Sequence, residues 1–251
     1  VEHGQIIHNC LVLKTDCCPS IYTSRKNIEF VFAPELKQIH EDRMFCDTDI
    51  KNVYMPKLSA ISGTYCFDQT KLMKLDFPSL KTIDGRVFGM NNFERVNLPS
   101  LLTMTNVNQF FGCSKLKYFE AVNLQLIGSN CFGQCVSLKV VNAPKAQIGS
   151  SAFFQCKKLE VLVARDNDFY CNCKVCPKCK RMLEKCFLNG KLFTEMGIHG
   201  KIRIKCISIQ KEELKKFLEK QQNLVLVGEL LKKFAELEKF VLKFCQVDVY
   251  E

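Results

Sequence analysis

Apolar and polar positions along this chain recur with a period of about 22 residues from residue 28 to residue 164. The intervals between copies are 22, 22, 21, 23, 22 and 21 residues, and the copies begin at Ile28, Ile50, Leu72, Phe93, Leu116, Leu138 and Leu159. Within each copy the first, fourth and sixth positions are apolar. Such a period predicts a solenoid, because one unit cannot bury its apolar face alone and must stack on its neighbours.

The start of each copy has the alternation of a short strand, with its apolar side chains on one face. Proline ends this strand at the seventh position of five copies, since it has no N–H to donate; these are Pro34, Pro56, Pro78, Pro99 and Pro144. Later in the copy stands an aromatic anchor, which we expect on a short helix or 3₁₀ turn: Phe45, Phe67, Phe88, Phe110, Phe132 and Phe153.

Three residues after the anchor, the last copies carry Cys113, Cys135 or Cys156. Free cysteine behaves as a small, readily buried hydrophobe. We therefore interpret these thiols as core residues in preference to metal ligands or disulfides.

The pattern L-x-x-V-x-apolar-P, followed by L-x-x-I-G-x-x-x-F-x-x-C, resembles the BspA-like, or Treponema-type, leucine-rich repeats over about half of the chain. The resemblance implies an α/β repeat solenoid, a right-handed superhelix with a parallel sheet on one face. It also implies a protein that binds other molecules, often at a cell surface or in host contact. The expected organisation is an N-terminal cap at 1–27, the solenoid at 28–164, and a Cys-rich cap with helices at 165–251.

The region after the repeats concentrates cysteines. The stretch N-D-F-Y-C-N-C, ending at Cys173, resembles the C-terminal flanking cap of extracellular leucine-rich-repeat proteins, with Asp168 where that cap has proline. The resemblance implies disulfides that tie Cys171 and Cys173 to Cys186 and Cys206, and it is the favoured interpretation.

Structural zinc is the alternative, held by Cys173, Cys176 and Cys179 with Cys171 or Cys186, because C-x2-C pairs place two thiolates on one tetrahedral ion. The spacing C-x2-C-x2-C also begins an iron–sulfur motif, but this sequence lacks the x3-C-P continuation of that motif. A redox C-x-x-C pair at Cys176 and Cys179 is disfavoured as well. No other cofactor is expected.

The end of the chain has helical periodicity at residues 210–222 and 229–244. The second segment carries an apolar stripe that packs on the cap, forms a homodimer seam, or lies on an acidic membrane surface through its lysines. Packing on the cap is favoured, and a scaffold that oligomerises through 229–244 is the alternative function.

The charge distribution and the absence of known catalytic motifs disfavour two classes of function, nucleic-acid binding and catalysis. Of the net charge of +10, +7 falls in residues 174–251, but these lysines alternate with glutamates and have no aromatic platform beside them, which disfavours nucleic acid. The sequence has no nucleophile elbow, phosphate loop, dinucleotide fingerprint or H-E-x-x-H. We expect a protein that is not an enzyme.

The third and fifth positions of the strands face outward if the apolar positions face the core. We predict that this face binds a protein or extracellular-matrix partner, because exposed Phe, Tyr and Arg anchor interfaces; self-packing of the rings or cover by a neighbouring chain is the alternative. The predicted contact residues are Phe30, Phe32, Asn52, Tyr54, Lys74, Asp76, Arg95, Asn97, Tyr118 and Glu120.

Compartment follows less directly from the sequence. No apolar run reaches the roughly 18–20 residues that span a bilayer, so membrane contact is not expected. The chain begins at Val1 without the apolar core of a signal peptide, which is compatible with a leader that was removed. Sixteen cysteines favour a cell-surface or secreted protein over a cytoplasmic one.

Overall fold

The computed structural model describes residues 2–16, 21–104, 106–165 and 168–195. The chain divides into two compact units, residues 1–191 and 192–251. Every strand of the described residues belongs to the first unit. Its repeats form the predicted parallel-sheet solenoid, which confirms the fold class.

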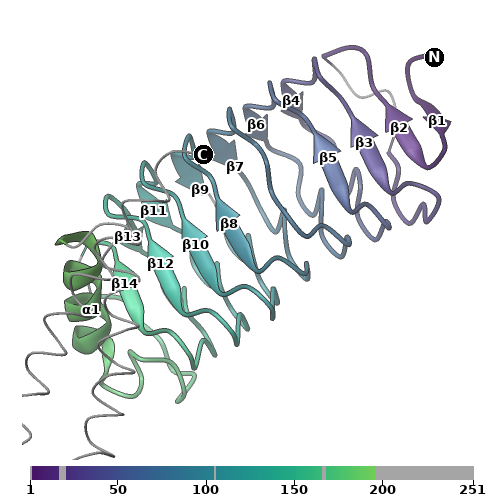
Figure 1. Cartoon of the computed structure of the whole chain (residues 1–251). Coiled ribbons are helices and arrows are strands. Elements are labelled where there is room, and N and C mark those ends of the chain that lie inside the picture. Colours follow the sequence, from purple (N-terminus) through teal and green to yellow (C-terminus); the bar gives the residue numbers. More distant parts are fainter. Residues whose placement is uncertain (1, 17–20, 105, 166–167, 196–251) are drawn as a thin grey trace, which may run out of the picture. The chain divides into compact units, whose positions relative to one another are not determined.

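One short strand opens each repeat except the third, and these strands lie side by side in Figure 1. They pair in parallel with equivalent repeat positions opposite each other, so that Phe32 lies beside Tyr54 and Arg95 beside Tyr118. The strands are β3 (Phe30–Phe32), β5 (Asn52–Tyr54), β8 (Arg95–Asn97), β10 (Tyr118–Glu120), β12 (Val140–Asn142) and β14 (Val161–Val163).

The third repeat interrupts this face, because residues 72–77 form no strand. The strands therefore divide into one sheet in the order β1-β2-β3-β5 and another in the order β14-β12-β10-β8. Lys74, Leu75 and Asp76 make the third repeat the one copy with neither a β-branched nor an aromatic residue at its third to fifth positions. Such residues favour extended backbone, so their lack explains the gap.

A second row of parallel strands occupies another face of the repeats, where the sequence led us to expect a sheet on one face only. One sheet joins β4 (Gln38–Ile39), β6 (Ala60–Ile61), β7 (Thr82–Ile83) and β9 (Thr103–Met104), and another joins β11 (Leu126–Ile127) to β13 (Gln147–Ile148). The second row continues through the third repeat, where the first row is interrupted. The two interruptions are staggered, so strand pairing in one row connects repeats where the other row has none.

The aromatic anchors lie on turns, not on the short helices that we expected. The residue two positions after each anchor has a left-handed backbone, with φ between 54° and 72°; these are Asp47, Gln69, Met90, Gly112, Gln134 and Gln155. An L-residue helix is right-handed, so a left-handed residue at this point ends any helical turn. The α part of the predicted α/β class is thus confined, among the described residues, to the C-terminal helix.

The anchors form a column of rings through the core. Successive centroids are 5.1–5.9 Å apart from Tyr22 to Phe153, and Phe169 meets Phe153 edge-on at 6.2 Å. This ring column comprises Tyr22, Phe45, Phe67, Phe88, Phe110, Phe132, Phe153 and Phe169. The first and last of these rings stand outside the repeats read from the sequence, and they extend the column beyond the repeats at both ends.

The N-terminal residues extend the first sheet. Strands β1 (Gln5–Ile7) and β2 (Cys10–Val12) form an antiparallel hairpin, and β2 pairs in parallel with β3. Positive φ at His8 and Asn9 gives the turn the twist that joins two such strands.

Helix α1 (Leu183–Glu195) follows the last repeat and stands beside β14 in Figure 1. The Asn189 amide donates to the Glu160 carbonyl at 2.8 Å. A Cβ on Gly190 would lie 2.1 Å from the Leu162 carbonyl oxygen, so the helix backbone directly abuts the strand. Sequence reading missed α1, and the helices predicted at 210–222 and 229–244 lie outside the described residues.

Candidate functional site

The predicted contact residues of the first sheet are exposed. Strand alternation buries Val31 and turns Phe30 and Phe32 outward on β3, while Asn52 and Tyr54 project from β5. The exposed fractions are 42% for Phe30, 44% for Phe32 and 54% for Tyr54. We call these three side chains the aromatic face.

The rings of the aromatic face are ordered by strand register. Phe32 and Tyr54 are direct cross-strand partners, and their rings stack with centroids 5.4 Å apart and an angle of 8° between planes. Each ring therefore covers one side of the other. The sequence-based alternative of self-packed rings accounts for this one contact, but not for the large exposed area that remains.

Two residues that sequence reasoning missed extend the same rows. Cys10 and Val12 on β2 are the register partners of Phe30 and Phe32, and both are half-buried. The sequence did contain a sign of this, because residues 10–13 have the composition of a strand. Parallel pairing of that strand with β3 then places Cys10 and Val12 beside the aromatic face. Across three strands, the fifth-position row is thus Val12, Phe32 and Tyr54.

The second sheet presents a more polar surface. The Arg95 guanidinium lies over the ring of its strand partner Tyr118, 4.0 Å from the centroid. The Asn142 amide donates to the Glu120 carboxylate at 2.9 Å. Exposure falls along the sheet from Arg95 and Asn97, which are exposed, to Val161, which is buried.

Lys74 and Asp76 lie between these two surfaces, on the repeat without a strand, and both are exposed. The structure thus places eight of the ten predicted residues on strands and these two on an irregular segment. The continuous seven-stranded surface expected from the repeat becomes an aromatic part and a polar part.

One serine–histidine contact occurs away from this face. His40 Nδ1 lies 2.9 Å from Ser62 Oγ, and both side chains are exposed. The contact joins equivalent positions 22 residues apart, as do the ion pairs Lys51–Glu29 and Lys71–Asp49. We interpret it as one more contact between stacked repeats.

Four cysteines after the last repeat gather their sulfur atoms. The Sγ atoms of Cys171, Cys173, Cys176 and Cys179, here the thiol cluster, all lie within 4.8 Å of one another. Cys186 lies outside it, buried, with its thiol donating to the Leu159 carbonyl at 3.3 Å. The described cysteines are all free thiols, so the structure does not bring Cys171 or Cys173 to Cys186, and Cys206 lies outside the described residues.

The thiols of the cluster differ in acidity. Burial raises the pKa of Cys173, but backbone N–H groups, those of Gln155, Val175 and Cys176, outweigh it and bring the pKa to about 6. Burial raises the pKa of Cys171 and of Cys176. Cys173 therefore loses its proton more readily than Cys171 and Cys176.

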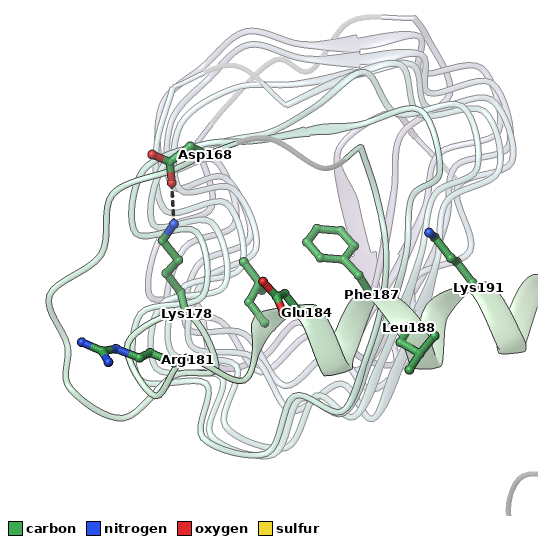
Figure 2. Close-up of a pocket in the computed structure, with 8 residues that line it drawn as sticks. Asp168, Lys178, Arg181, Glu184, Phe187, Leu188 and Lys191 are labelled. Carbon is green, nitrogen blue, oxygen red and sulfur yellow. Dashed lines mark hydrogen bonds and ion pairs between the residues drawn. The ribbon is translucent and has the colours of Figure 1, made fainter.

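A shallow hollow of about 860 Å³ lies between the Cys-rich loop and α1. Figure 2 shows Lys178 reaching Asp168, with Phe187 and Leu188 extending from α1 in different directions. Leu188 is exposed and Phe187 is half-buried. The hollow combines basic and acidic groups with a small apolar wall.

A solenoid of stacked repeats with parallel strands and an inward phenylalanine in each turn defines a leucine-rich-repeat protein. The chain belongs to the BspA type leucine-rich repeat family, whose model matches six copies over residues 22–160. Proteins of this fold generally serve in protein interaction and act as non-enzymatic scaffolds.

Comparison with solved structures gives a leucine-rich repeat protein from Bacteroides ovatus ATCC 8483 as similar, at 19% identity and a TM-score of 0.42. The similarity covers 61% of this chain and 48% of that one, so the present chain spans about half of its length. No curated protein matches this sequence. Within the described residues, no helix is both long enough and apolar enough to cross a membrane.

Proposed function

We propose that this chain is a non-enzymatic protein-binding module whose contact surface is centred on the aromatic face. The observation that supports this is the exposure of Phe30, Phe32 and Tyr54 on neighbouring strands. Large aromatic side chains are rarely left together in water, and such rings are enriched at the centres of protein interfaces.

The geometry of the face suits binding without rearrangement. Strand pairing fixes the backbone of β3 and β5, and the stacking of Phe32 on Tyr54 restricts both rings before a partner arrives. Ordering side chains at an interface costs about 0.5–1.5 kcal/mol each, so preordered rings reduce that cost. A flat apolar centre of this kind fits a folded protein surface or an extended peptide laid across the strands.

Polar residues of the repeats complete the proposed surface. Lys74 and Asp76 follow the aromatic face, and Arg95, held over Tyr118, comes next along the stack with Asn97 and Glu120. The proposed partner is a cell-surface or extracellular-matrix protein with an apolar patch opposite the rings and an acidic group opposite Arg95. Rim charges of this kind set specificity and association rate more than affinity.

The test compares a double variant, Phe32→Ala/Tyr54→Ala, with the unaltered chain and with Leu126→Ala. Leu126 lies on β11 in the second row of strands and is 41% exposed, so it controls for the loss of an exposed apolar side chain. The immobilised chain is screened against purified matrix proteins and solubilised surface proteins, and each interaction is then titrated with a purified partner.

We expect the double variant to bind its partner at least 100-fold more weakly, because central aromatic side chains each contribute about 2 kcal/mol or more. Leu126→Ala is expected to bind like the unaltered chain. Equal affinity of the double variant and the unaltered chain would remove the aromatic face from the interface. A light-scattering mass for each protein detects a second copy of the chain on the face.

A further inference from the structure

The loop between the last repeat and α1 has little apolar burial to hold its shape. Residues 170–182 contain no strand or helix, and of their side chains only Cys176 and Pro177 are buried. The loop is nevertheless tightly turned, with hydrogen bonds from Lys180 N to Cys176 O at 3.0 Å and from Met182 N to Pro177 O at 2.8 Å. A segment with this little apolar burial commonly depends on disulfides or a metal ion.

The sulfur spacing separates these two possibilities. The Cys171 and Cys176 Sγ atoms are 3.7 Å apart, and those of Cys173 and Cys179 are 3.9 Å apart. A tetrahedral zinc ion with Zn–S bonds of about 2.3 Å places its sulfurs about 3.8 Å apart. A disulfide needs about 2.05 Å. Two independent pairs therefore have the edge length of one ZnS₄ tetrahedron, and the remaining separations stay within 4.8 Å.

Backbone groups support the same arrangement. The Cys176 N–H donates to Cys173 Sγ at 3.3 Å, across the C-x2-C turn in which Lys174 has a left-handed φ of 64°. Amide donors of this kind orient a sulfur and stabilise it as a thiolate. Four basic residues stand between or beside the cysteines in the sequence: Lys174, Lys178, Lys180 and Arg181. Four thiolates around one divalent ion carry a net negative charge, and these basic residues supply positive charge close to it.

We propose that Cys171, Cys173, Cys176 and Cys179 bind one zinc ion that fixes the Cys-rich loop between the last repeat and α1. Binding converts four thiols and one Zn²⁺ into a tetrahedral tetrathiolate centre of net charge −2 and releases four protons. Four soft sulfur donors fill a tetrahedral coordination shell, which is the ligand set of a closed structural Zn²⁺ site. An iron–sulfur cluster needs wider sulfur separations, since its own inorganic atoms lie between the thiolates.

The structure also decides the fourth ligand that the sequence left open between Cys171 and Cys186. Cys171 lies in the cluster, whereas the Cys186 thiol donates to a carbonyl of the last repeat. Cys186 is therefore the matched control for each ligand: a nearby cysteine of the same region that the proposal excludes.

The experiment uses the full chain, purified under reducing conditions and supplied with zinc chloride, then desalted and analysed for metal per chain. We expect about one zinc for the unaltered chain and for Cys186→Ala, and close to none for Cys176→Ser or Cys173→Ser. Replacement of zinc by Co²⁺ is expected to give the sulfur-to-metal charge-transfer absorption and intense visible bands of tetrahedral thiolate cobalt. This readout on the unaltered chain does not depend on whether a variant folds.

Three results would overturn the proposal. The first is a chain that retains no zinc after reconstitution with its thiols reduced, and the second is a cobalt spectrum without thiolate charge transfer. The third is a loss of zinc in Cys186→Ala equal to that in Cys176→Ser, which would assign a different ligand set. Because metal content is measured without a partner, these results are independent of the proposed binding function.

Discussion

The rings of Phe32 and Tyr54 lie nearly parallel, 5.4 Å apart, on two strands that are separated by one repeat in sequence. Both rings are large, and both keep about half of their surface in water. Repetition at a fixed period makes such contacts, because equivalent positions of successive repeats become strand neighbours.

The Phe32–Tyr54 stack is expected to contribute a measurable coupling to stability. A double-mutant cycle of Phe32→Ala and Tyr54→Ala should give a coupling free energy of about 0.5–1.5 kcal/mol, the range of aromatic pairs beyond simple burial. The free energy of unfolding is measured by urea titration with thiols reduced. Phe32→Ala combined with Leu126→Ala, whose residues lie on different sheets, should instead be additive within about 0.5 kcal/mol. Additivity in both cycles would mean that the stack is energetically neutral.

Loss of one ring from the ring column should destabilise the repeats strongly. Phe132 is fully buried between Phe110 and Phe153, with centroids 5.8 Å and 5.9 Å away. Phe132→Ala should lower the free energy of unfolding by about 3–5 kcal/mol, because it leaves a cavity that the stacked turns cannot close. Phe30→Ala removes an exposed ring of the same type and should cost less than about 1 kcal/mol. Equal costs for the two variants would contradict a core role for the column.

The cysteine three residues after each late anchor has a donor role that the sequence did not reveal. The Cys135 thiol donates to the carbonyl of Phe110, the anchor of the preceding repeat, at 3.1 Å, and Thr48 at the equivalent place donates to the carbonyl of its own anchor, Phe45, at 2.8 Å. Cys135→Thr should therefore be more stable than its isostere Cys135→Val by about 1 kcal/mol, the net value of a buried hydrogen bond. A higher urea midpoint for the valine variant would show that only apolar burial matters there.

The same buried thiols make stability fall in alkaline solution. Burial raises the pKa of Cys113 from about 9 to about 12. Below pH 9 the Cys113 thiol keeps its proton in both the folded and the unfolded chain, so its contribution to the free energy of unfolding is complete there. Above pH 9 the thiol loses its proton in the unfolded chain but keeps it in the folded chain. The contribution therefore falls as pH rises from 9 and is gone near pH 12.

Between pH 8 and pH 10 we expect the unaltered chain to lose about 1.4 kcal/mol more than Cys113→Ala does. Lysine and tyrosine titrations occur in both proteins and cancel in the comparison. The measurement is a urea titration at each pH, and parallel pH profiles would show that Cys113 does not titrate differently in the two states.

Replacement of Gly190 tests the contact between α1 and the last repeat. In an unhindered helix interior, Gly→Ala stabilises by about 0.5–1 kcal/mol. Here the new Cβ would meet the backbone of Leu162, so Gly190→Ala should instead destabilise by about 1–3 kcal/mol. Leu188→Ala, at an exposed position of the same helix, is the control and should change stability by less than about 0.5 kcal/mol. Thermal unfolding followed by circular dichroism distinguishes the two signs.

The sequence by itself determined the repeat, its core positions and the outward direction of its third and fifth residues. These features depend on residue type and spacing within one unit. The first and sixth positions are buried in every repeat, apart from the partly buried Ala164, because both are apolar in every copy and each stacked repeat buries its apolar positions against its neighbours. The same local chemistry, the lack of β-branched and aromatic residues at Lys74–Asp76, explains in hindsight the gap in the strands.

Tertiary structure alone decided which residues meet at the ends of the stack. Tyr22 and Phe169 join the ring column, Cys171 and not Cys186 enters the thiol cluster, and Gly190 brings α1 against β14. The contacts of Phe169 and Gly190 follow no fixed spacing, because each joins the last repeat to a segment outside the period, whereas Tyr22 precedes Phe45 by one repeat interval of 23 residues. Their geometry depends on how the irregular segments pack against the first and last repeats.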